Sequence, residues 1–448
     1  MVFFDTLEKH SYVYDILRRV VRFIFAYVFY RRFYVVNREK IPPLKTPMIL
    51  VSNHQNGLLD ALGILFAMPY KYTVAFLARA DIFKNPKAAK FLNFLKIMPV
   101  YRQRDGGDHL EENNIIFDES AKLIGLGLPI ALFPEGQHQN GHFLGPIKKG
   151  FARIAFDTAE RNHFPENMLV LPLANHYSDY FSYRSELCIA FGDPIRLSDY
   201  YAQYKENPPK AMLNLADEVK IRIQNLMLNI PYPQHYQELD FLRTMVRPDL
   251  CLSMKLDQDY FPDTLKADRF LMQKIESKTP EEVDELCKKA KSYQEELHRL
   301  GVSCQEVEEN YNKKFLLGNF LCLLVYAPFA LYGLVFNYLP LYFGHKKAKE
   351  RAEAIKNKML QPSFEFVFSE LLMTAAFYLL YTIVFWIWNH SFIVYLEFLV
   401  SLIIGKVVWL EYKRFWNKCY RQYNAYKHRN LIKDKIRLLA KDLKKMSL

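Results

Sequence analysis

The stretch MILVSNHQNGLLDAL, Met48–Leu62, joins a strand pattern to a helix pattern through a short polar turn. Four apolar residues, Met48–Val51, are typical of a buried strand, and the apolar run from Leu58 is typical of the start of a helix. His54 and Asp60 lie on either side of that turn, with five residues between them. The stretch therefore predicts a strand, a turn and a helix, with an imidazole and a carboxylate where the strand ends.

Further apolar runs alternate with helical patterns through the first 200 residues. They predict strands over Tyr72–Ala78, Lys96–Tyr101, Leu128–Phe133, Met168–Ala174 and Leu187–Gly192. Helical spacing fills the intervals, for example 108–124 and 150–161. This alternation predicts an α/β domain over residues 37–200, with a central, mostly parallel sheet flanked by helices. In such sheets, chemistry gathers at the carboxyl ends of the strands.

The second half of the chain divides into three regions. Residues 201–310 are polar and predict a helical extension, which includes a helix over 278–300 whose start is capped by Thr279. Residues 311–412 form a hydrophobic membrane region with three apolar segments, and residues 413–448 form a polybasic tail. This tail has twelve Lys or Arg residues and two acids, so it carries +10 of the net charge of +12.

The three apolar segments predict membrane-embedded helices. They run over Phe315–Gly344, Leu371–Trp388 and Phe392–Leu410. A helix needs about 20 apolar residues to cross a bilayer, and the first segment has 30 residues without a charge. Core helices of a large soluble domain are the weaker alternative.

The membrane topology is predicted from prolines and charges. Pro328, Gly333 and Pro340 interrupt the first segment, so we expect it to enter the membrane and return. The other two segments would form a spanning hairpin that turns at Asn389–His390. A shallow hairpin in the interface is the alternative, because Glu397 and Lys406 are costly in a span.

Charge and cysteine content indicate the partner and the compartment. A polybasic tail directly after apolar segments favours an anionic membrane as partner over nucleic acid. The basic residues that flank the apolar segments predict a catalytic domain on the cytoplasmic side of a membrane. Six scattered cysteines without a CxxC pattern favour reduced thiols over disulfides or a zinc site.

The N-terminal segment, residues 1–36, predicts an amphipathic helix that lies in the membrane interface. Within it, Ser11–Phe33 combines apolar and aromatic residues with basic ones at helical spacing. We expect the lipid phosphates to contact Arg18, Arg19, Arg22, Arg31 and Arg32. An ordinary amphipathic helix packed on the domain is the alternative.

His54 and Asp60 are a candidate catalytic pair. If the helix begins near Leu58, Asp60 can turn back and accept a hydrogen bond from Nδ1 of His54, which leaves Nε2 free as a base. The chain has no GxSxG motif, so the attacking hydroxyl would belong to the substrate. The first N–H groups of the helix could stabilise developing negative charge. The alternative is a structural turn with a helix cap.

Polar residues also follow other predicted strands. Arg102 and Arg104 suit a phosphate or carboxylate, although solvated arginines are the commoner case. Glu135 could hold a substrate hydroxyl or cap the next segment, and Gly136 permits close approach of the backbone. Pro172 within a strand pattern predicts an edge strand or a bulge near a site.

A metal site is not expected. Four histidines invite the hypothesis, namely His138, His142, His163 and His176. However, the sequence has no HExxH motif and no Cys/His spacing of a metal site.

Taken together and in order, four blocks resemble the glycerolipid acyltransferase family, which includes glycerol-3-phosphate and lysophosphatidate (1-acylglycerol-3-phosphate) acyltransferases. NHQNGLLD resembles its His–Asp block and YRQRDG its arginine block. FPEG resembles its glutamate–glycine block and VLPLA its last, proline-bearing block. The resemblance covers about residues 37–200.

The resemblance implies a role for each matching residue. His54 would deprotonate the acceptor hydroxyl and Asp60 would orient His54. Arg102, with Arg104 as a weaker candidate, would bind the phosphate of the acceptor. Glu135 and Gly136 would position the glycerol backbone, and Pro172 would shape the acyl or acceptor site. Acyl-CoA or acyl carrier protein would be the co-substrate, and no cofactor is expected.

Two departures from the family pattern affect the choice of substrate. The family usually has four residues between His and Asp, whereas this chain has five. The longer spacing is similar to the branch that acylates glycerol 3-phosphate or dihydroxyacetone phosphate. FPEGQHQN also lacks the Ser, Thr or Arg that often follows the glycine. The alternatives are lysophosphatidate, another lysolipid or an amino-acid lipid as acceptor, or a non-enzymatic membrane scaffold.

Overall fold

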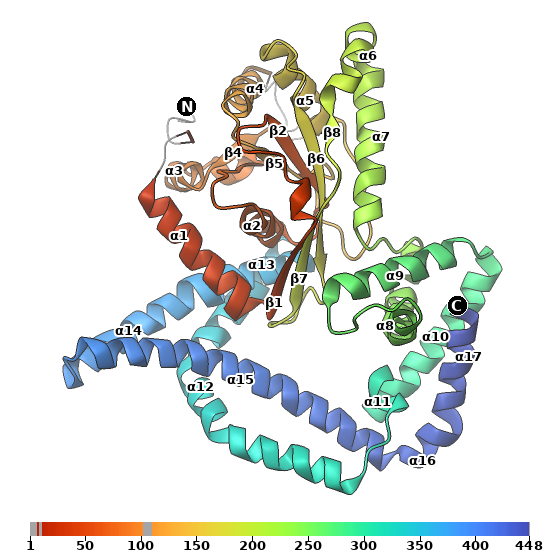
Figure 1. The fold of residues 1–448 in the computed structure, drawn as a ribbon. Coiled ribbons are helices and arrows are strands. Elements are labelled where there is room, and N and C mark those ends of the chain that lie inside the picture. Colours follow the sequence, from red (N-terminus) through yellow and green to blue (C-terminus); the bar gives the residue numbers. More distant parts are fainter. Residues whose placement is uncertain (1–6, 9–10, 102–109, 448) are drawn as a thin grey trace. The chain divides into compact units, whose positions relative to one another are not determined.

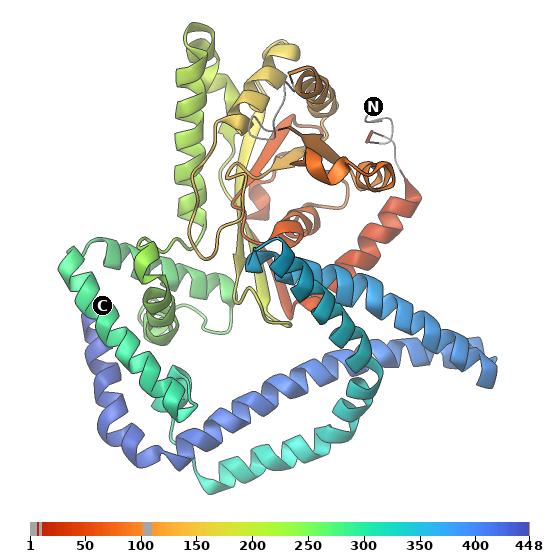
Figure 2. The ribbon, with the colours of Figure 1, turned by 180° about the vertical axis from the view of Figure 1, so that it is seen from behind.

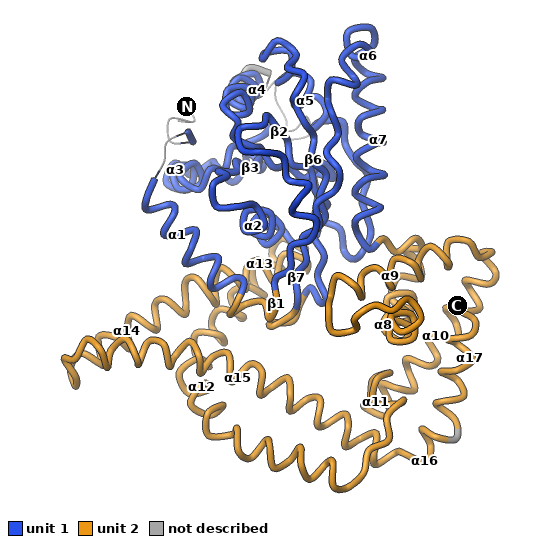
Figure 3. The backbone as a smooth tube through the Cα atoms, in the orientation of Figure 1, with its two compact units in different colours: residues 1–26, 33–180, 186–228 blue, residues 27–32, 181–185, 229–448 orange. Residues whose placement is uncertain are grey.

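The computed structural model describes residues 7–8, 11–101 and 110–447. The chain forms two compact units, coloured separately in Figure 3. Unit 1 comprises residues 1–26, 33–180 and 186–228, and it contains the predicted α/β domain. Unit 2 comprises residues 27–32, 181–185 and 229–448, and it contains the apolar segments.

Unit 1 is built on a mostly parallel sheet. Its strands are β1 (Arg32–Val36), β2 (Met48–Ser52), β3 (Ala75–Arg79), β4 (Ile97–Val100), β5 (Ile130–Leu132), β6 (Leu169–Tyr177), β7 (Glu186–Phe191) and β8 (Ile195–Arg196). The order is β1-β7-β6-β2-β5-β3-β4, and β8 pairs with β6. The strands from β6 to β4 in this order pair in parallel, whereas β7 and β8 run antiparallel to β6. The predicted fold class is confirmed; β1 and β8 were not predicted.

Helices cover both faces of the sheet (Figures 1 and 2), so all five residues of β2 are buried. On one face, Ile49 and Val51 belong to a core shared with α4 (Leu110–Gly125), α5 (Gly150–Arg161) and α7 (Pro208–Leu226). On the other face lies α2 (Gly57–Ala67). Gly63 lets α2 approach β7, because a Cβ there would lie 3.0 Å from the side chain of Ile189. The elements that follow β2 are thus held closely against the sheet. The shorter helices α3 (Pro86–Phe94) and α6 (Tyr201–Glu206) complete the unit.

The N-terminal segment differs from the predicted single helix. It forms α1 (Tyr12–Phe23) and a π-helical segment, Ile24–Phe29, after which β1 begins at Arg32. The prediction that Arg18 faces lipid is also wrong. Its buried guanidinium donates to the carbonyl oxygens of Leu65, Tyr70 and Tyr72, at 2.9, 3.2 and 2.9 Å. Arg18 therefore satisfies carbonyl groups at the end of α2 and in the turn that follows.

The predicted helical extension, residues 201–310, is divided between the units. Its helices α6 and α7 belong to unit 1, and unit 2 contains α8 (Tyr236–Ser253), α9 (Phe261–Glu276), α10 (Pro280–Leu300) and α11 (Cys304–Glu308). The predicted cap is present at α10, where the side chains of Thr279 and Glu282 bind each other's backbone N–H groups at 3.3 and 2.8 Å. The basic tail is also helical, over α16 (Arg429–Leu431) and α17 (Arg437–Ser447). Lys444 pairs with Asp249 at 2.7 Å, so part of the tail's charge is neutralised inside unit 2.

Within the described part of unit 2, three helices are long and apolar enough to cross a membrane. They span Lys313–Ala354, Lys358–Trp388 and Phe392–Lys427. The first is α12, the second includes α13 (Gln361–Glu365), a π-helical segment and α14 (Thr374–Trp388), and the third is α15. Many large apolar side chains on these helices are exposed, as is typical of surfaces that face lipid. The helices therefore indicate membrane association. The predicted turn at Asn389–His390 joins α14 to α15.

The predicted break in the first apolar segment is wrong, because α12 is one helix of 42 residues. Pro340 leaves the carbonyl oxygen of Phe336 without its helical donor, and the hydroxyl of Tyr381 supplies a replacement at 3.1 Å. Gly333 allows close contact with Gly405 of α15, since a Cβ at Gly333 would lie 1.9 Å from the Gly405 carbonyl oxygen.

Lys406, which is costly in an apolar segment, has a partner. Its ammonium lies 2.6 Å from Oε2 of Glu370, and each side chain is 1% exposed. Lys406 also donates to the hydroxyl of Thr374 at 3.0 Å. The pair thus joins α15 to the second apolar helix by a buried ion pair.

Candidate active site

The site lies where β2 ends and α2 begins. Nδ1 of His54 is 2.9 Å from Oδ2 of Asp60, the contact expected from the sequence. A carboxylate only accepts hydrogen bonds, so Nδ1 carries a proton, and in the neutral imidazole the lone pair is then on Nε2. The His54 side chain is 15% exposed, whereas that of Asp60 is fully buried. The imidazole is thus the accessible member of the pair.

Asp60 is bound through both of its carboxylate oxygens. Besides Nδ1 of His54, Oδ2 accepts the backbone N–H groups of Gln55 and Asn56, at 2.8 and 2.7 Å. Gly57 makes this turn possible because it adopts a φ of 46°, which favours glycine. The N–H groups of Gln55 and Asn56, which precede α2, therefore serve Asp60. Stabilisation of substrate charge by the first N–H groups of α2 stays a prediction.

Tyr177 binds the other oxygen of Asp60. This buried residue at the end of β6 donates its hydroxyl to Oδ1 at 2.5 Å. Asn53 and Asn175 hold the same strand ends together, because the Asn53 side chain accepts from the Asn175 N–H at 2.8 Å and donates to the Asn175 carbonyl oxygen at 3.1 Å. Sequence reasoning gave none of these three residues a role. Asn53 is the first residue of the NHQNGLLD block, whereas Asn175 and Tyr177 lie at the end of β6, outside every motif.

Glu135 braces His54 from the end of β5. Its Oε1 accepts the backbone N–H of His54 at 2.6 Å, and its Oε2 accepts that of Gly145 at 2.8 Å. The side chain is buried. Burial raises the pKa of Glu135 to about 7, and the two N–H bonds oppose that rise. This geometry supports a bracing role; contact with a glycerol backbone stays a prediction.

Two rings pack on the His54 imidazole. The Phe133 ring is stacked on it, with centroids 4.0 Å apart, and the His138 ring lies at the same distance with a tilt of 59°. Burial and the neighbouring His54 lower the pKa of His138 to about 3, so His138 is neutral. These contacts restrict the orientation of the His54 ring.

The other histidines considered for a metal have different contacts. Nδ1 of His142 lies 3.0 Å from the Tyr180 hydroxyl, and Nε2 of His176 lies 2.9 Å from the Leu226 carbonyl oxygen. His163 lies beyond the end of α5, in a left-handed backbone conformation with φ of 61°. Across the described ranges of the chain, no group of three or more His, Cys, Asp or Glu side chains is arranged to hold a metal ion.

Comparison with known proteins identifies the domain. The family model described as "Acyltransferase" matches residues 32–175. A chloroplastic 1-acyl-sn-glycerol-3-phosphate acyltransferase of Brassica napus is 31% identical over 27% of this chain and 32% of its own length. Residues 32–175 therefore match an acyltransferase family model, and their similarity to this relative supports the glycerolipid acyltransferase family.

Two further similarities concern larger parts of the chain. An uncharacterized acyltransferase of Schizosaccharomyces pombe is 24% identical over 51% of this chain and 33% of its own length. The chain thus spans about a third of the length of the curated relatives it matches. The crystal structure of the 1-acyl-sn-glycerophosphate acyltransferase PlsC from Thermotoga maritima aligns with 49% of this chain and 86% of its own, at 18% identity and a TM-score of 0.33. At that score the likeness carries no weight.

The remaining motif residues of the acyltransferase domain are placed as follows. Arg102 and Arg104 lie outside the described residues, so their roles stay predictions. Gly136 has a φ of 65°, and a Cβ there would lie 2.9 Å from the ammonium of Lys148. The backbone N–H of Lys148 binds the Pro134 carbonyl oxygen at 3.0 Å. The FPEG motif thus forms a tight turn beside a lysine.

Pro172 does not lie on an edge strand as predicted, because β6 is between β2 and β7. Its position opposite Val51 places it in the interior of the sheet. On the other side, β6 pairs first with β8 and then with β7. Val170 lies opposite Ile195, and Leu173 lies opposite Phe191. The two residues of β6 are three positions apart, whereas their two partners are four positions apart. The extra residue is a bulge in the neighbouring chain, so the missing N–H of Pro172 breaks no regular pairing.

Replacing Tyr177 by phenylalanine is expected to lower kcat of the acyltransferase reaction about tenfold and to leave KM unchanged. The substitution removes the donor to Oδ1 of Asp60, so the carboxylate that orients His54 is held less firmly. Tyr201→Phe is the matched control, because the Tyr201 hydroxyl donates to the Pro165 carbonyl oxygen at 2.8 Å, away from His54. Equal effects of both substitutions would contradict a positioning role.

Glu135 predicts a pH dependence of stability. In the unfolded chain its pKa is near 4.5, and in the folded protein it is about 7. Between these values the native state binds the extra proton, so the free energy of unfolding falls as pH rises through this window, by at most about 3 kcal/mol. Thermal unfolding midpoints of wild type and Glu135→Gln across this range measure the effect. The slope should be absent in the variant; equal slopes would contradict the assignment.

Proposed function

We propose that this chain is a membrane-bound O-acyltransferase of phospholipid synthesis. It would transfer a fatty acyl group from acyl-CoA or acyl carrier protein to a hydroxyl of glycerol 3-phosphate or dihydroxyacetone phosphate. The observation that carries the proposal is the His54–Asp60 contact of 2.9 Å at the end of a central strand. Within an acyltransferase domain, that arrangement is suited to general-base catalysis.

The reaction follows from the state of the imidazole. Nε2 of His54 takes the proton of the acceptor hydroxyl, and the oxygen forms a bond with the carbonyl carbon of the thioester. The carbon–sulfur bond then breaks, and the thiolate leaves with the proton that His54 holds. Asp60 stabilises the imidazolium between these steps through Oδ2. No covalent acyl-enzyme is required.

The acceptor is proposed from the motif spacing. Five residues between His54 and Asp60 resemble the branch that acts on glycerol 3-phosphate. In that role Arg102, with Arg104 as a weaker candidate, binds the phosphate, and Pro172 shapes the substrate site. The membrane helices keep the amphiphilic product at the lipid surface, and the catalytic domain faces the cytoplasm.

Lysophosphatidate is the second candidate acceptor. The Brassica napus relative is named as a 1-acyl-sn-glycerol-3-phosphate acyltransferase, which favours it. Both candidates carry a phosphate, so both predict that Arg102→Ala raises the acceptor KM. Another lysolipid or an amino-acid lipid without a phosphate would be insensitive to that substitution.

An acyl-transfer assay of the purified full chain tests the proposal. Glycerol 3-phosphate, dihydroxyacetone phosphate and lysophosphatidate are each offered with acyl-CoA and with acyl carrier protein as donors. We expect His54-dependent transfer to glycerol 3-phosphate. His54-dependent transfer to lysophosphatidate alone would select the second candidate. Failure of every acceptor would overturn both.

A further inference from the structure

The outer side of α1 is an exposed apolar stripe, although its inner side also packs on unit 1. The stripe consists of Tyr12, Val13, Ile16, Val20 and Phe23, all exposed and spaced to lie on one side of the helix. On the inner side, Tyr14 is buried and its ring meets that of Phe94 of α3, with centroids 6.1 Å apart. A helix that faces water is usually polar on its outer side, and an exposed apolar stripe of this kind is typical of a contact surface.

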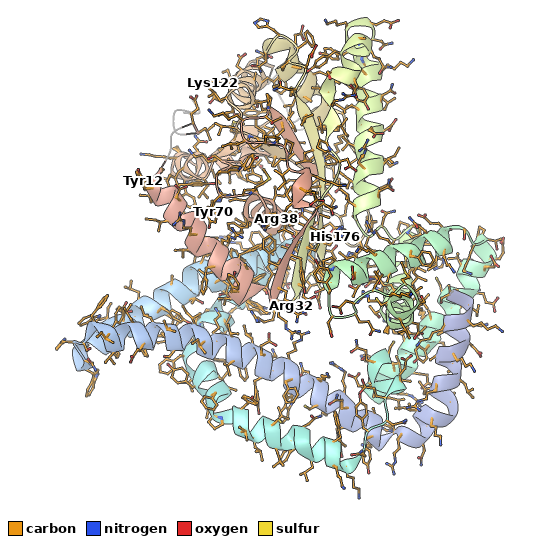
Figure 4. All side chains as sticks on the ribbon, viewed as in Figure 1. Tyr12, Arg32, Arg38, Tyr70, Lys122 and His176 are labelled. Atoms are coloured by element: carbon orange, nitrogen blue, oxygen red, sulfur yellow. The ribbon has the colours of Figure 1, made fainter. Side chains whose placement is uncertain are left out.

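Arginines lie along one edge of the stripe and are held by an aromatic ring. The guanidinium carbons of Arg19 and Arg22 lie 5.6 and 5.3 Å from the centre of the Tyr70 ring. Figure 4 shows Tyr12 at the outer end of α1 and Tyr70 beside this helix. These two arginines therefore provide positive charge beside the stripe, in place of the buried Arg18.

The neighbouring helix α3 has the same combination of exposed apolar and basic residues. Phe91 and, just before the helix, Ile82 are exposed, and so are Lys84, Lys87 and Lys90. The contact of Tyr14 with Phe94 joins α3 to α1, and both views of the fold show the two helices as neighbours (Figures 1 and 2). The sequence prediction of membrane contact included α1 and not α3.

We propose that α1 and α3 together form a docking face of unit 1 for an anionic bilayer surface. The apolar stripe, Phe91 and Ile82 enter the interface. The basic residues that contact lipid phosphates are Arg19, Arg22, Lys84, Lys87 and Lys90. Charge complementarity selects this occupant, because five basic residues accompany the apolar side chains. The chain also runs from α1 into residues 27–32, which belong to the unit with the candidate membrane spans.

Lipid quenching of single-cysteine labels tests the docking face. An environment-sensitive fluorophore is attached at Val20→Cys of α1, at Phe91→Cys of α3 and at Ile221→Cys of α7 as the control. These side chains are similarly exposed, at 51%, 56% and 52%, and α7 lies across the sheet from α1 (Figures 1 and 2). The background carries Cys322→Ser, because Cys322 is an exposed native cysteine. The full chain is reconstituted in phosphatidylcholine vesicles with phosphatidylglycerol and a spin-labelled lipid.

We expect strong quenching at positions 20 and 91 and none at 221. Quenching at position 20 alone would overturn the role of α3, and equal quenching at all three positions or at none would overturn the docking face. Ile82→Cys repeats the α3 measurement if Phe91→Cys does not fold. The readout needs no catalysis, so its failure is separate from failure of the proposed activity.

Lysine substitutions test the electrostatic part. In the reconstituted full chain with anionic lipid, Lys87→Gln with Lys90→Gln should lower the ratio of docked to undocked unit 1, measured by quenching at position 20, roughly thirtyfold, at about fivefold for each charge removed. Lys210→Gln with Lys220→Gln, two exposed lysines of α7, is the matched control and should have no effect. The contact with lipid phosphates would be overturned if the α3 pair and the α7 pair of substitutions had equal effects. It would also be overturned if the α3 pair had the same effect in vesicles of phosphatidylcholine alone.

Discussion

His54→Ala is expected to lower kcat of acyl transfer by a factor of about 10² to 10⁴, the usual contribution of a general base. KM for the acceptor should change little, because the loss is in proton transfer and not in binding. The backbone N–H that binds Glu135 is retained, so the fold at the end of β2 should persist. Steady-state kinetics with saturating donor measures the effect.

Asp60→Asn tests the same pair from the other side. An amide that donates to Nδ1 would favour the tautomer with its proton on Nε2, which cannot act as a base. We therefore expect a loss of kcat of the same order as for His54→Ala, and the double variant should lose little more. His235→Ala is the control, since His235 pairs with Asp284 in unit 2. Wild-type turnover in His54→Ala would end the mechanism.

Glu370→Ala is expected to destabilise unit 2 by about 3–5 kcal/mol, because it leaves the ammonium of Lys406 buried without its anion. The unfolding midpoint of the detergent-solubilised protein should fall by about 10 °C. Replacing both residues by methionine should restore most of the loss, since an apolar pair removes both buried charges.

Glu397→Ala is the matched control for that experiment. Glu397 is an exposed acid on α15, the helix that carries Lys406. Its removal should therefore leave the unfolding midpoint nearly unchanged. Equal destabilisation by Glu370→Ala and Glu397→Ala would show that the Lys406–Glu370 pair does not stabilise the packing of the apolar helices.

Local patterns predicted most of the elements of unit 1. The apolar run of β2 and the helix over 150–161 agree with the structure. Burial of a strand or of one side of a helix determines which positions are apolar, and that pattern is visible in a few consecutive residues. β1 was missed because Arg32–Val36 continues the basic and aromatic pattern of the preceding helix. Two prolines in α12 wrongly indicated a break, since the hydroxyl that compensates one of them comes from another helix.

The part of the site that lies within a short stretch of the chain was also predicted. His54 and Asp60 are six positions apart, so a turn and a helix start suffice to bring them together. Tyr177 is 117 positions from Asp60, and only the parallel pairing of β2 with β6 brings its hydroxyl to Oδ1. Glu135 was predicted to hold a substrate hydroxyl or to cap the next segment; its bond to the backbone N–H of His54, which depends on the adjacent ends of β2 and β5, was not predicted.

The sequence by itself determined the strand–turn–helix unit, the contact of His54 with Asp60 and the three apolar helices, because each depends on residues that are close together along the chain. The tertiary structure decided which charges have partners. Arg18 is buried on carbonyl groups of another element, Lys406 is neutralised by Glu370, and Tyr177 completes the binding of Asp60. Such contacts depend on strand order and helix crossings, and the distance between the partners along the chain hides them from any local pattern.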